Sequence, residues 1–182
     1  MGGPDKTFIQ LMGRPVLFYS VQTLQDCQLI DDIVLVLSAS NSDLGRSLVE
    51  TSDWDKVVDV CLGGNRRQDS VHRGLEALPD SGWVIVHDAA RPFCSSALIA
   101  RTIDAAVYHG AAIPGLAVSD TLKQRSVGPG WFVSRTLSRE QVVQAQTPQA
   151  FRSEVLARAI GLGQTAEIAT DEATLVERAG GK

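Results

Sequence analysis

Three side chains with different chemistry lie close together near the middle of the chain. His87, Asp88 and Arg91 follow the apolar run at residues 83–86, which is rich in β-branched residues. Such a run predicts a buried strand, and ligands of parallel α/β sheets bind beyond the carboxyl ends of the strands. We therefore interpret this group as a candidate ligand site. The alternative is a surface ion pair between Asp88 and Arg91 that caps the strand.

Two glycine-containing loops carry cations that suit phosphate groups. Lys6 follows two glycines at the start of the chain and supplies a point charge. The loop at residues 63–70 begins with two glycines, contains Arg67 and opens a predicted helix. Free N–H groups at a helix start and arginine side chains both bind anions. The alternatives are a solvated lysine in the first loop and an ordinary turn with a helix cap in the second.

The available groups favour chemistry on phosphate over hydrolysis by an activated serine or cysteine. The sequence contains no G-x-S-x-G motif, no Walker motif and no His/Cys set with metal-ligand spacing. Cations, hydroxyls, glycines and one well-placed carboxylate suit phosphoryl or nucleotidyl transfer, in which the protein mainly positions groups and neutralises charge. In such a reaction we expect Asp88 to hold Mg²⁺, directly or through water.

The composition predicts one globular domain over residues 1–182, because 44% of the residues are hydrophobic and 21% are charged. The net charge of −4 offers no basic surface for nucleic acid. We expect no membrane span and no signal peptide. Cys27, Cys61 and Cys94 are odd in number and widely spaced, which fits a reducing compartment and hence a cytoplasmic protein.

Strands and helices alternate along the sequence. We predict strands over residues 33–37, 57–62, 83–87 and 111–118, and helices over residues 15–25, 43–50, 69–78, 96–109, 151–162 and 171–179. Ser95 and Thr170 are expected to cap the fourth and sixth helices. The alternation predicts an α/β fold with a Rossmann-like, doubly wound, mostly parallel sheet.

The pattern changes between residues 120 and 144. Two extended segments flank a turn at residues 128–130, and three apolar residues follow that turn at residues 131–133. A hairpin of this kind has too little core to be stable alone. We therefore predict that residues 120–144, called the arm below, protrude and mediate dimerisation.

Several short motifs together resemble the 2-C-methyl-D-erythritol 4-phosphate cytidylyltransferases of the non-mevalonate isoprenoid pathway. These motifs lie, in the order of that family, at residues 63–71, 86–92, 120–121, 146–149 and 170–173. The resemblance covers the whole chain. It implies a Mg²⁺-dependent transferase in which the phosphate of methylerythritol phosphate attacks the α-phosphate of CTP and pyrophosphate leaves.

The resemblance also implies residue roles on the nucleotide side. Lys6 would stabilise the α-phosphate in the transition state. Gly64, Asn65 and Ser70 would recognise the cytosine and ribose of CTP, where backbone groups can reject a purine by size.

On the sugar-phosphate side, Asp88 and Ala89 match positions near the metal and the substrate. The hydroxyls of Thr121, Thr147 and Thr170 would line the pocket. Arg139 would reach from the arm into the active site of the partner subunit, so the resemblance implies a homodimer.

The chain also departs from the family pattern. The family begins with a strand and a glycine-rich loop carrying a second arginine, and it has a lysine near its C-terminus. This sequence contains none of these, so we expect a chain truncated at both ends and two unpaired sheet edges.

Two other functions stay open. A pentitol-phosphate cytidylyltransferase, acting for example on ribitol 5-phosphate, would share the fold, CTP and most motifs; Ala89 and Ala90 favour the methylerythritol enzyme. A nucleotide-binding or dimerisation module without turnover is the alternative from another class.

Overall fold

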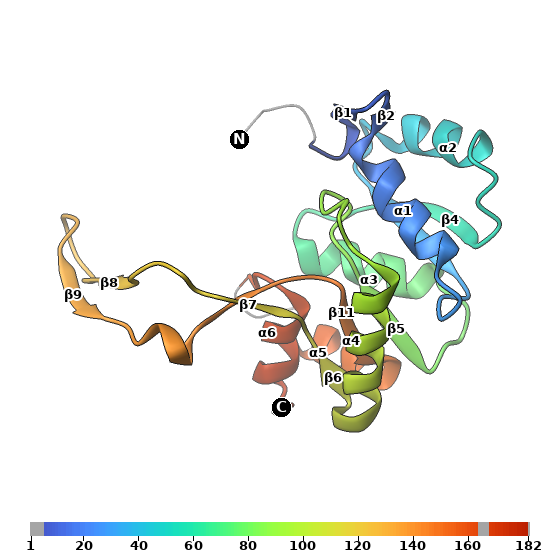
Figure 1. The fold of residues 1–182 in the computed structure, drawn as a ribbon. Coiled ribbons are helices and arrows are strands. Elements are labelled where there is room, and N and C mark those ends of the chain that lie inside the picture. The colour runs from blue at the N-terminus through green and yellow to red at the C-terminus, as the bar shows by residue number, and fades with distance from the viewer. Residues whose placement is uncertain (1–5, 164–167, 182) are drawn as a thin grey trace.

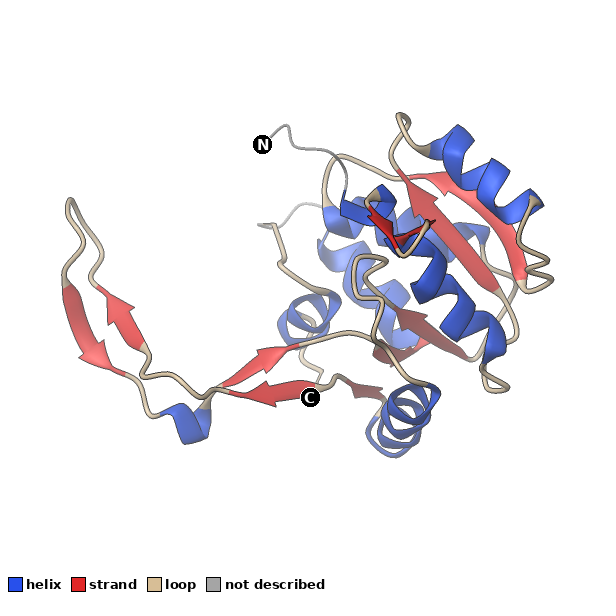
Figure 2. Ribbon diagram, turned by 45° about the horizontal axis from the view of Figure 1, so that its top comes forward, coloured by secondary structure: helices blue, strands red, loops and turns tan. Residues whose placement is uncertain are grey.

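The computed structural model of the chain describes residues 6–163 and 168–181, and the glycine-rich loop predicted before Lys6 lies outside these residues. Figures 1 and 2 show a body of helices and strands from which one long arm extends. The described chain begins with a short 3₁₀ helix, η1 (Lys6–Phe8), followed by the small hairpin β1 (Gln10–Leu11) and β2 (Arg14–Pro15).

One part of the body is built on two parallel strands. β3 (Ile33–Leu37) and β4 (Val57–Leu62) have the predicted bounds and pair in parallel. On one face Ile33, Leu35 and Leu37 pack with residues of α1 (Val16–Asp26). On the other face Val36 lies against α3 (Arg67–Ala77), where it would touch a Cβ placed on Gly74 at 2.8 Å. Because alternate residues of a strand face opposite sides, helices cover both faces, as the predicted doubly wound fold requires.

The second part of the body contains an antiparallel strand that the sequence pattern did not predict. β11 (Gln149–Arg152) pairs with β5 (Trp83–Val86) on one side and β6 (Ala111–Ala112) on the other, antiparallel to both. The prediction that a helix begins at Phe151 is therefore wrong, and α5 spans Ser153–Gly163. Among the described residues β3 pairs with β4 alone and β5 with β11 alone, so each has an edge without a hydrogen-bonded strand.

Two further helices, α3 and α6, differ from the predictions at their start. α3 begins at Arg67 rather than residue 69. α6 (Glu172–Arg178) is capped by Asp171, whose side chain accepts a hydrogen bond from the N–H of Thr174, and not by Thr170. Three helices follow the predictions closely: α1 and α2 (Ser42–Glu50) begin within one residue of the predicted start, and α4 (Ser96–His109) begins directly after the predicted cap, Ser95.

The arm leaves the body through a two-stranded ladder. The predicted strand at residues 111–118 breaks at Pro114, and its second part, β7 (Gly115–Ala117), pairs with β10 (Val143–Ala145). Beyond this ladder β8 (Lys123–Arg125) and β9 (Val133–Thr136) form a hairpin, followed by the 3₁₀ turn η2 (Arg139–Gln141). Every residue of these four strands is exposed, so the arm has no core of its own.

Two apolar clusters form the core. The first joins α1 to the β3–β4 pair; its buried members are Leu17, Val21, Ile33, Leu35, Leu37, Trp54 and Val60. The second joins β5 and β11 to the last two helices; its buried members are Val84, Phe151, Leu156, Ala159, Ile160, Ala169, Leu175 and Val176. None of the helices in the described residues is long and apolar enough to cross a membrane.

Candidate active site

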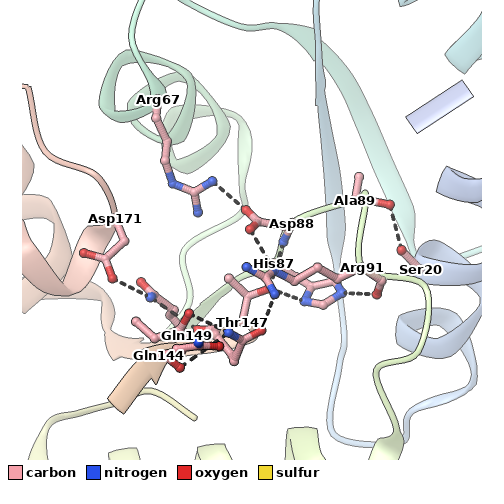
Figure 3. A network of polar contacts seen from close by, with 12 residues as sticks. Ser20, Arg67, His87, Asp88, Ala89, Arg91, Gln144, Thr147, Gln149 and Asp171 are labelled. Atoms are coloured by element: carbon pink, nitrogen blue, oxygen red, sulfur yellow. Dashed lines mark hydrogen bonds and ion pairs between the residues drawn. The ribbon is translucent and has the colours of Figure 1, made fainter. Parts of the chain in front are cut away.

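The carboxylate of Asp88 lies at the centre of a polar network at the end of β5 (Figure 3). Its Oδ1 accepts a hydrogen bond from Arg67 Nη1 at 2.5 Å, and its Oδ2 accepts one from Arg91 Nε at 3.1 Å. Its main-chain N–H donates to Thr147 Oγ1 at 3.2 Å. The ion pair between Asp88 and Arg91, which was the alternative to a ligand site, is therefore present, but it belongs to a larger cluster from several elements.

Arg67 reaches Asp88 from the first residue of α3 and bridges two carboxylates. Its Nη2 donates to Glu172 Oε2 at 2.8 Å, and its Nε lies 3.2 Å from both oxygens of the same carboxylate. The Glu172 side chain is 1% exposed, whereas Arg67 and Asp88 are about one-third exposed at 32% and 29%. The network thus runs from a buried acid to a solvent-facing one.

The charges in the network shift one another's protonation. Burial alone would raise the pKa of Asp88, but hydrogen bonds from Arg67 and Arg91 outweigh it and hold that pKa below its usual value. Burial raises the pKa of Glu172, and the pairing with Arg67 works against that rise. Asp88 is therefore ionised at neutral pH.

His87 is held as a neutral ring beside Asp88. Its Nε2 lies 3.2 Å from the carbonyl oxygen of Arg91, which can only accept, so Nε2 carries the proton. Its Nδ1 then accepts from the Thr147 hydroxyl at 3.0 Å. Burial lowers the pKa of His87 below its usual value, which is consistent with this neutral tautomer.

A pocket of about 200 Å³ opens beside this network. It brings together five of the residues that the sequence singled out: Arg67, Asp88, Arg91, Thr147 and Thr170. Four further residues complete the lining: Ala145, Gln146, Gln149 and Asp171. Arginine guanidinium groups and hydroxyls around a small cavity suit a phosphorylated ligand.

The turn between β4 and α3 holds the second group of predicted residues. The N–H of Gly64 donates to Ser70 Oγ at 3.0 Å, and Asn65 is exposed beside them. A Cβ on Gly64 would lie 2.3 Å from the Cβ of Asp69, so any larger residue at this position would force the turn or Asp69 to shift. Arg66 and Asp69 form an ion pair of 2.6 Å across the same turn.

The other predicted residues lie outside the pocket lining. The carbonyl of Ala89 accepts from Ser20 Oγ at 2.8 Å, which ties the loop after β5 to α1 (Figure 3). Lys6 is exposed in η1, and Thr121 is exposed at the base of the arm. Arg139, in η2 of the arm, donates to the carbonyl of Ser119 at 2.9 Å.

The sequence did not single out the residues that complete the polar network around Asp88. Gln149 Nε2 donates to Asp171 Oδ2 at 3.0 Å, and Glu172 binds Arg67 from a position 105 residues away in sequence. Acidic residues such as this Asp-Glu pair are common at helix starts, because their negative charge interacts favourably with the helix dipole. The sequence therefore carried no signal that Glu172 would be buried.

The donor set around Asp88 suits Mg²⁺ only together with a ligand. Among residues 6–163 and 168–181, no three His, Cys, Asp or Glu side chains come together as a metal site. Mg²⁺ commonly uses one or two carboxylates and completes its shell with water and substrate phosphates. Asp88 can supply such a carboxylate if the ion displaces part of its contact with the arginines.

An α/β body with cations, hydroxyls and carboxylates beyond its strand ends is an arrangement that suits proteins acting on phosphate esters. Within that class, the sequence model of the 2-C-methyl-D-erythritol 4-phosphate cytidylyltransferases matches residues 1–182. The chain belongs to this family.

Named relatives agree with the match. A 2-C-methyl-D-erythritol 4-phosphate cytidylyltransferase of Dehalococcoides mccartyi is 42% identical over 179 residues, which cover 98% of this chain and 77% of the relative. A bifunctional enzyme IspD/IspF of Anaeromyxobacter dehalogenans is 42% identical over 98% of this chain and 46% of its own length. The crystal structure of the 4-diphosphocytidyl-2C-methyl-D-erythritol synthase of Anaerococcus prevotii superposes with a TM-score of 0.87 at 30% identity, covering 99% of this chain and 78% of that one.

Proposed function

We propose that this chain transfers the cytidylyl group of CTP to 2-C-methyl-D-erythritol 4-phosphate and releases pyrophosphate. A phosphate oxygen of the sugar phosphate forms the new bond to the α-phosphorus of CTP, and the bond from that phosphorus to pyrophosphate breaks. The observation that carries the proposal is the pocket in which Arg67, Asp88 and Arg91 meet the hydroxyls of Thr147 and Thr170. Family membership supplies the two substrates.

Several of the predicted residues act directly on the two substrates in this reaction. Arg91 and the two threonines bind the phosphate and hydroxyls of the sugar phosphate, and the turn containing Gly64 and Ser70 receives the cytidine. Lys6 neutralises charge that develops at the α-phosphate. Mg²⁺ held by Asp88 would supply further neutralisation of the triphosphate and support the departure of pyrophosphate.

We also propose that the protein is a homodimer formed through the arm. Val127, Trp131, Phe132 and Val133 are exposed on it, and exposed apolar clusters mark contact surfaces. In this dimer Arg139 serves the partner's site. We also propose a cytoplasmic location, which the free state of Cys27, Cys61 and Cys94 supports.

The test is pyrophosphate release by this chain with CTP, Mg²⁺ and methylerythritol phosphate, each omitted in turn. We expect release that requires all three, and we expect ribitol 5-phosphate to be a poor replacement. Arg91→Ala should raise the KM for methylerythritol phosphate, whereas Arg101→Ala, an exposed arginine on α4, should not. Equal or better turnover of ribitol 5-phosphate would overturn the choice of substrate.

A further inference from the structure

We propose that Glu172 is a positioning residue: its buried carboxylate fixes the Arg67 guanidinium, and through it the Asp88 carboxylate, in the wall of the 200 Å³ pocket. Glu172 does not line that pocket. It acts through Arg67, and the inference about its effect on turnover rests on the proposed function.

The contact between Glu172 and Arg67 defines an orientation as well as a charge pair. Nη2 and Nε of the guanidinium both face the carboxylate, at 2.8 Å and 3.2 Å, so the planar group is held along one edge. The remaining nitrogen, Nη1, then points at Asp88 Oδ1 at 2.5 Å. Two-point contacts of this kind give arginine a geometry that a single ion pair does not.

Glu172 is itself fixed by the start of α6. Asp171 caps this helix by accepting from the N–H of Thr174 at 3.0 Å and accepts from Gln149 Nε2 at the same distance. Gln149 Oε1 in turn accepts from the N–H of Ala173 at 3.4 Å. The helix start is therefore fastened to β11 on both sides of Glu172, and the carboxylate is directed inward where it is 1% exposed.

The chain of contacts makes Arg67 dependent on Glu172. Arg67 is 32% exposed. If Asp88 were its only partner, this long side chain would sample several rotamers. Asp88 faces the pocket and contacts Arg91 as well. Removal of the Glu172 charge should therefore loosen the pocket wall without opening a cavity.

The experiment compares Glu172→Gln with Glu177→Gln, an exposed glutamate on the same helix. We expect Glu172→Gln to raise the KM for methylerythritol phosphate and lower kcat/KM by about 10- to 100-fold, with the KM for CTP unchanged. A merely structural role would reduce the active fraction, lowering kcat with both KM values unchanged, and would overturn the proposal. In an Arg67→Ala background, Glu172→Gln should have no further effect, because Glu172 acts through that arginine.

A second measurement does not depend on turnover. Relative to the NMR spectra of the unmutated chain, the signals of the Arg67 Nε–H and the Asp88 carboxyl carbon should both shift in Glu172→Gln and stay unchanged in Glu177→Gln. An unchanged Asp88 signal would refute the positioning role. If the unmutated chain releases no pyrophosphate, the proposed function fails on its own, and these spectra alone decide the role of Glu172.

Discussion

Thr147 Oγ1 lies 3.0 Å from Nδ1 of His87, although 60 residues separate the two in sequence. The contact joins the loop after β5 to the cis-proline segment before β11. In the neutral ring that burial favours, one nitrogen accepts from Thr147 and the other donates to the carbonyl of Arg91.

The first prediction concerns pH and His87. Burial lowers the folded-state pKa of His87 below 6.5, so the unfolded chain binds more protons as the pH falls through that value. Stability present above pH 6.5 is therefore lost below it. We expect the free energy of unfolding to decline between about pH 7.5 and about pH 5.5, and to decline less in His87→Gln. Urea titrations at a series of pH values measure this free energy, and an equal decline in His87→Gln would contradict the role of His87.

The second prediction concerns Phe151, which is 0% exposed between β5 and α5. Phe151→Ala should lower the free energy of unfolding by about 3–5 kcal/mol, because it removes buried apolar area and leaves a cavity. Phe93 is 90% exposed, and Phe93→Ala should change stability by less than about 0.5 kcal/mol. Similar losses in the two variants would contradict the assignment of Phe151 to the core.

The third prediction concerns the turn at Gly64. Gly64→Ala must displace Asp69, whose Cβ lies 2.3 Å from the added methyl group, and should cost about 1–3 kcal/mol and raise the KM for CTP. Gly161→Ala in α5 meets nothing within 4 Å and should stabilise the protein by up to about 1 kcal/mol. Thermal unfolding and CTP titration measure the two effects; a wild-type KM for Gly64→Ala would argue against a nucleotide site at this turn.

The fourth prediction concerns the arm and dimerisation. Val127→Ser combined with Phe132→Ser should weaken the dimer at least about tenfold, because both side chains are exposed at the tip of the hairpin. Tyr108→Ser removes an equally exposed aromatic ring from α4 and serves as the control. Sedimentation equilibrium measures the dissociation constant, and unchanged association in the double variant would exclude the arm tip from the interface.

The fifth prediction concerns Lys6 and Arg139, which we expect to act in the same active site from different subunits. Lys6→Ala should lower kcat by about 100- to 1,000-fold with little effect on CTP affinity, because its charge is needed most in the transition state. Arg139→Ala should impair use of the sugar phosphate. Mixing the two variants should restore about a quarter of wild-type activity, because mixed dimers hold one site with both side chains intact. Mixtures that stay inactive would show that Arg139 does not serve the partner.

The sequence by itself determined the elements whose signals are local. β3 and β4 are short runs rich in β-branched residues, which favour strands, and both have the predicted bounds. The positions of Asp88 and Arg91 beyond β5 were also predictable, because the apolar run of the strand ends directly before these polar residues. The motifs were also sufficient to indicate the family.

Only the tertiary structure decided the elements that depend on distant partners. The sequence of β11, Gln-Ala-Phe-Arg, has no strand period, and it is extended because β5 and β6 bond to it on both sides. The bridge from Glu172 through Arg67 to Asp88 likewise spans 105 and 21 residues of sequence. From the local sequence, a carboxylate at a helix start is expected to be an exposed charge. The Glu172 carboxylate is buried only because α6 packs against β11 and α3.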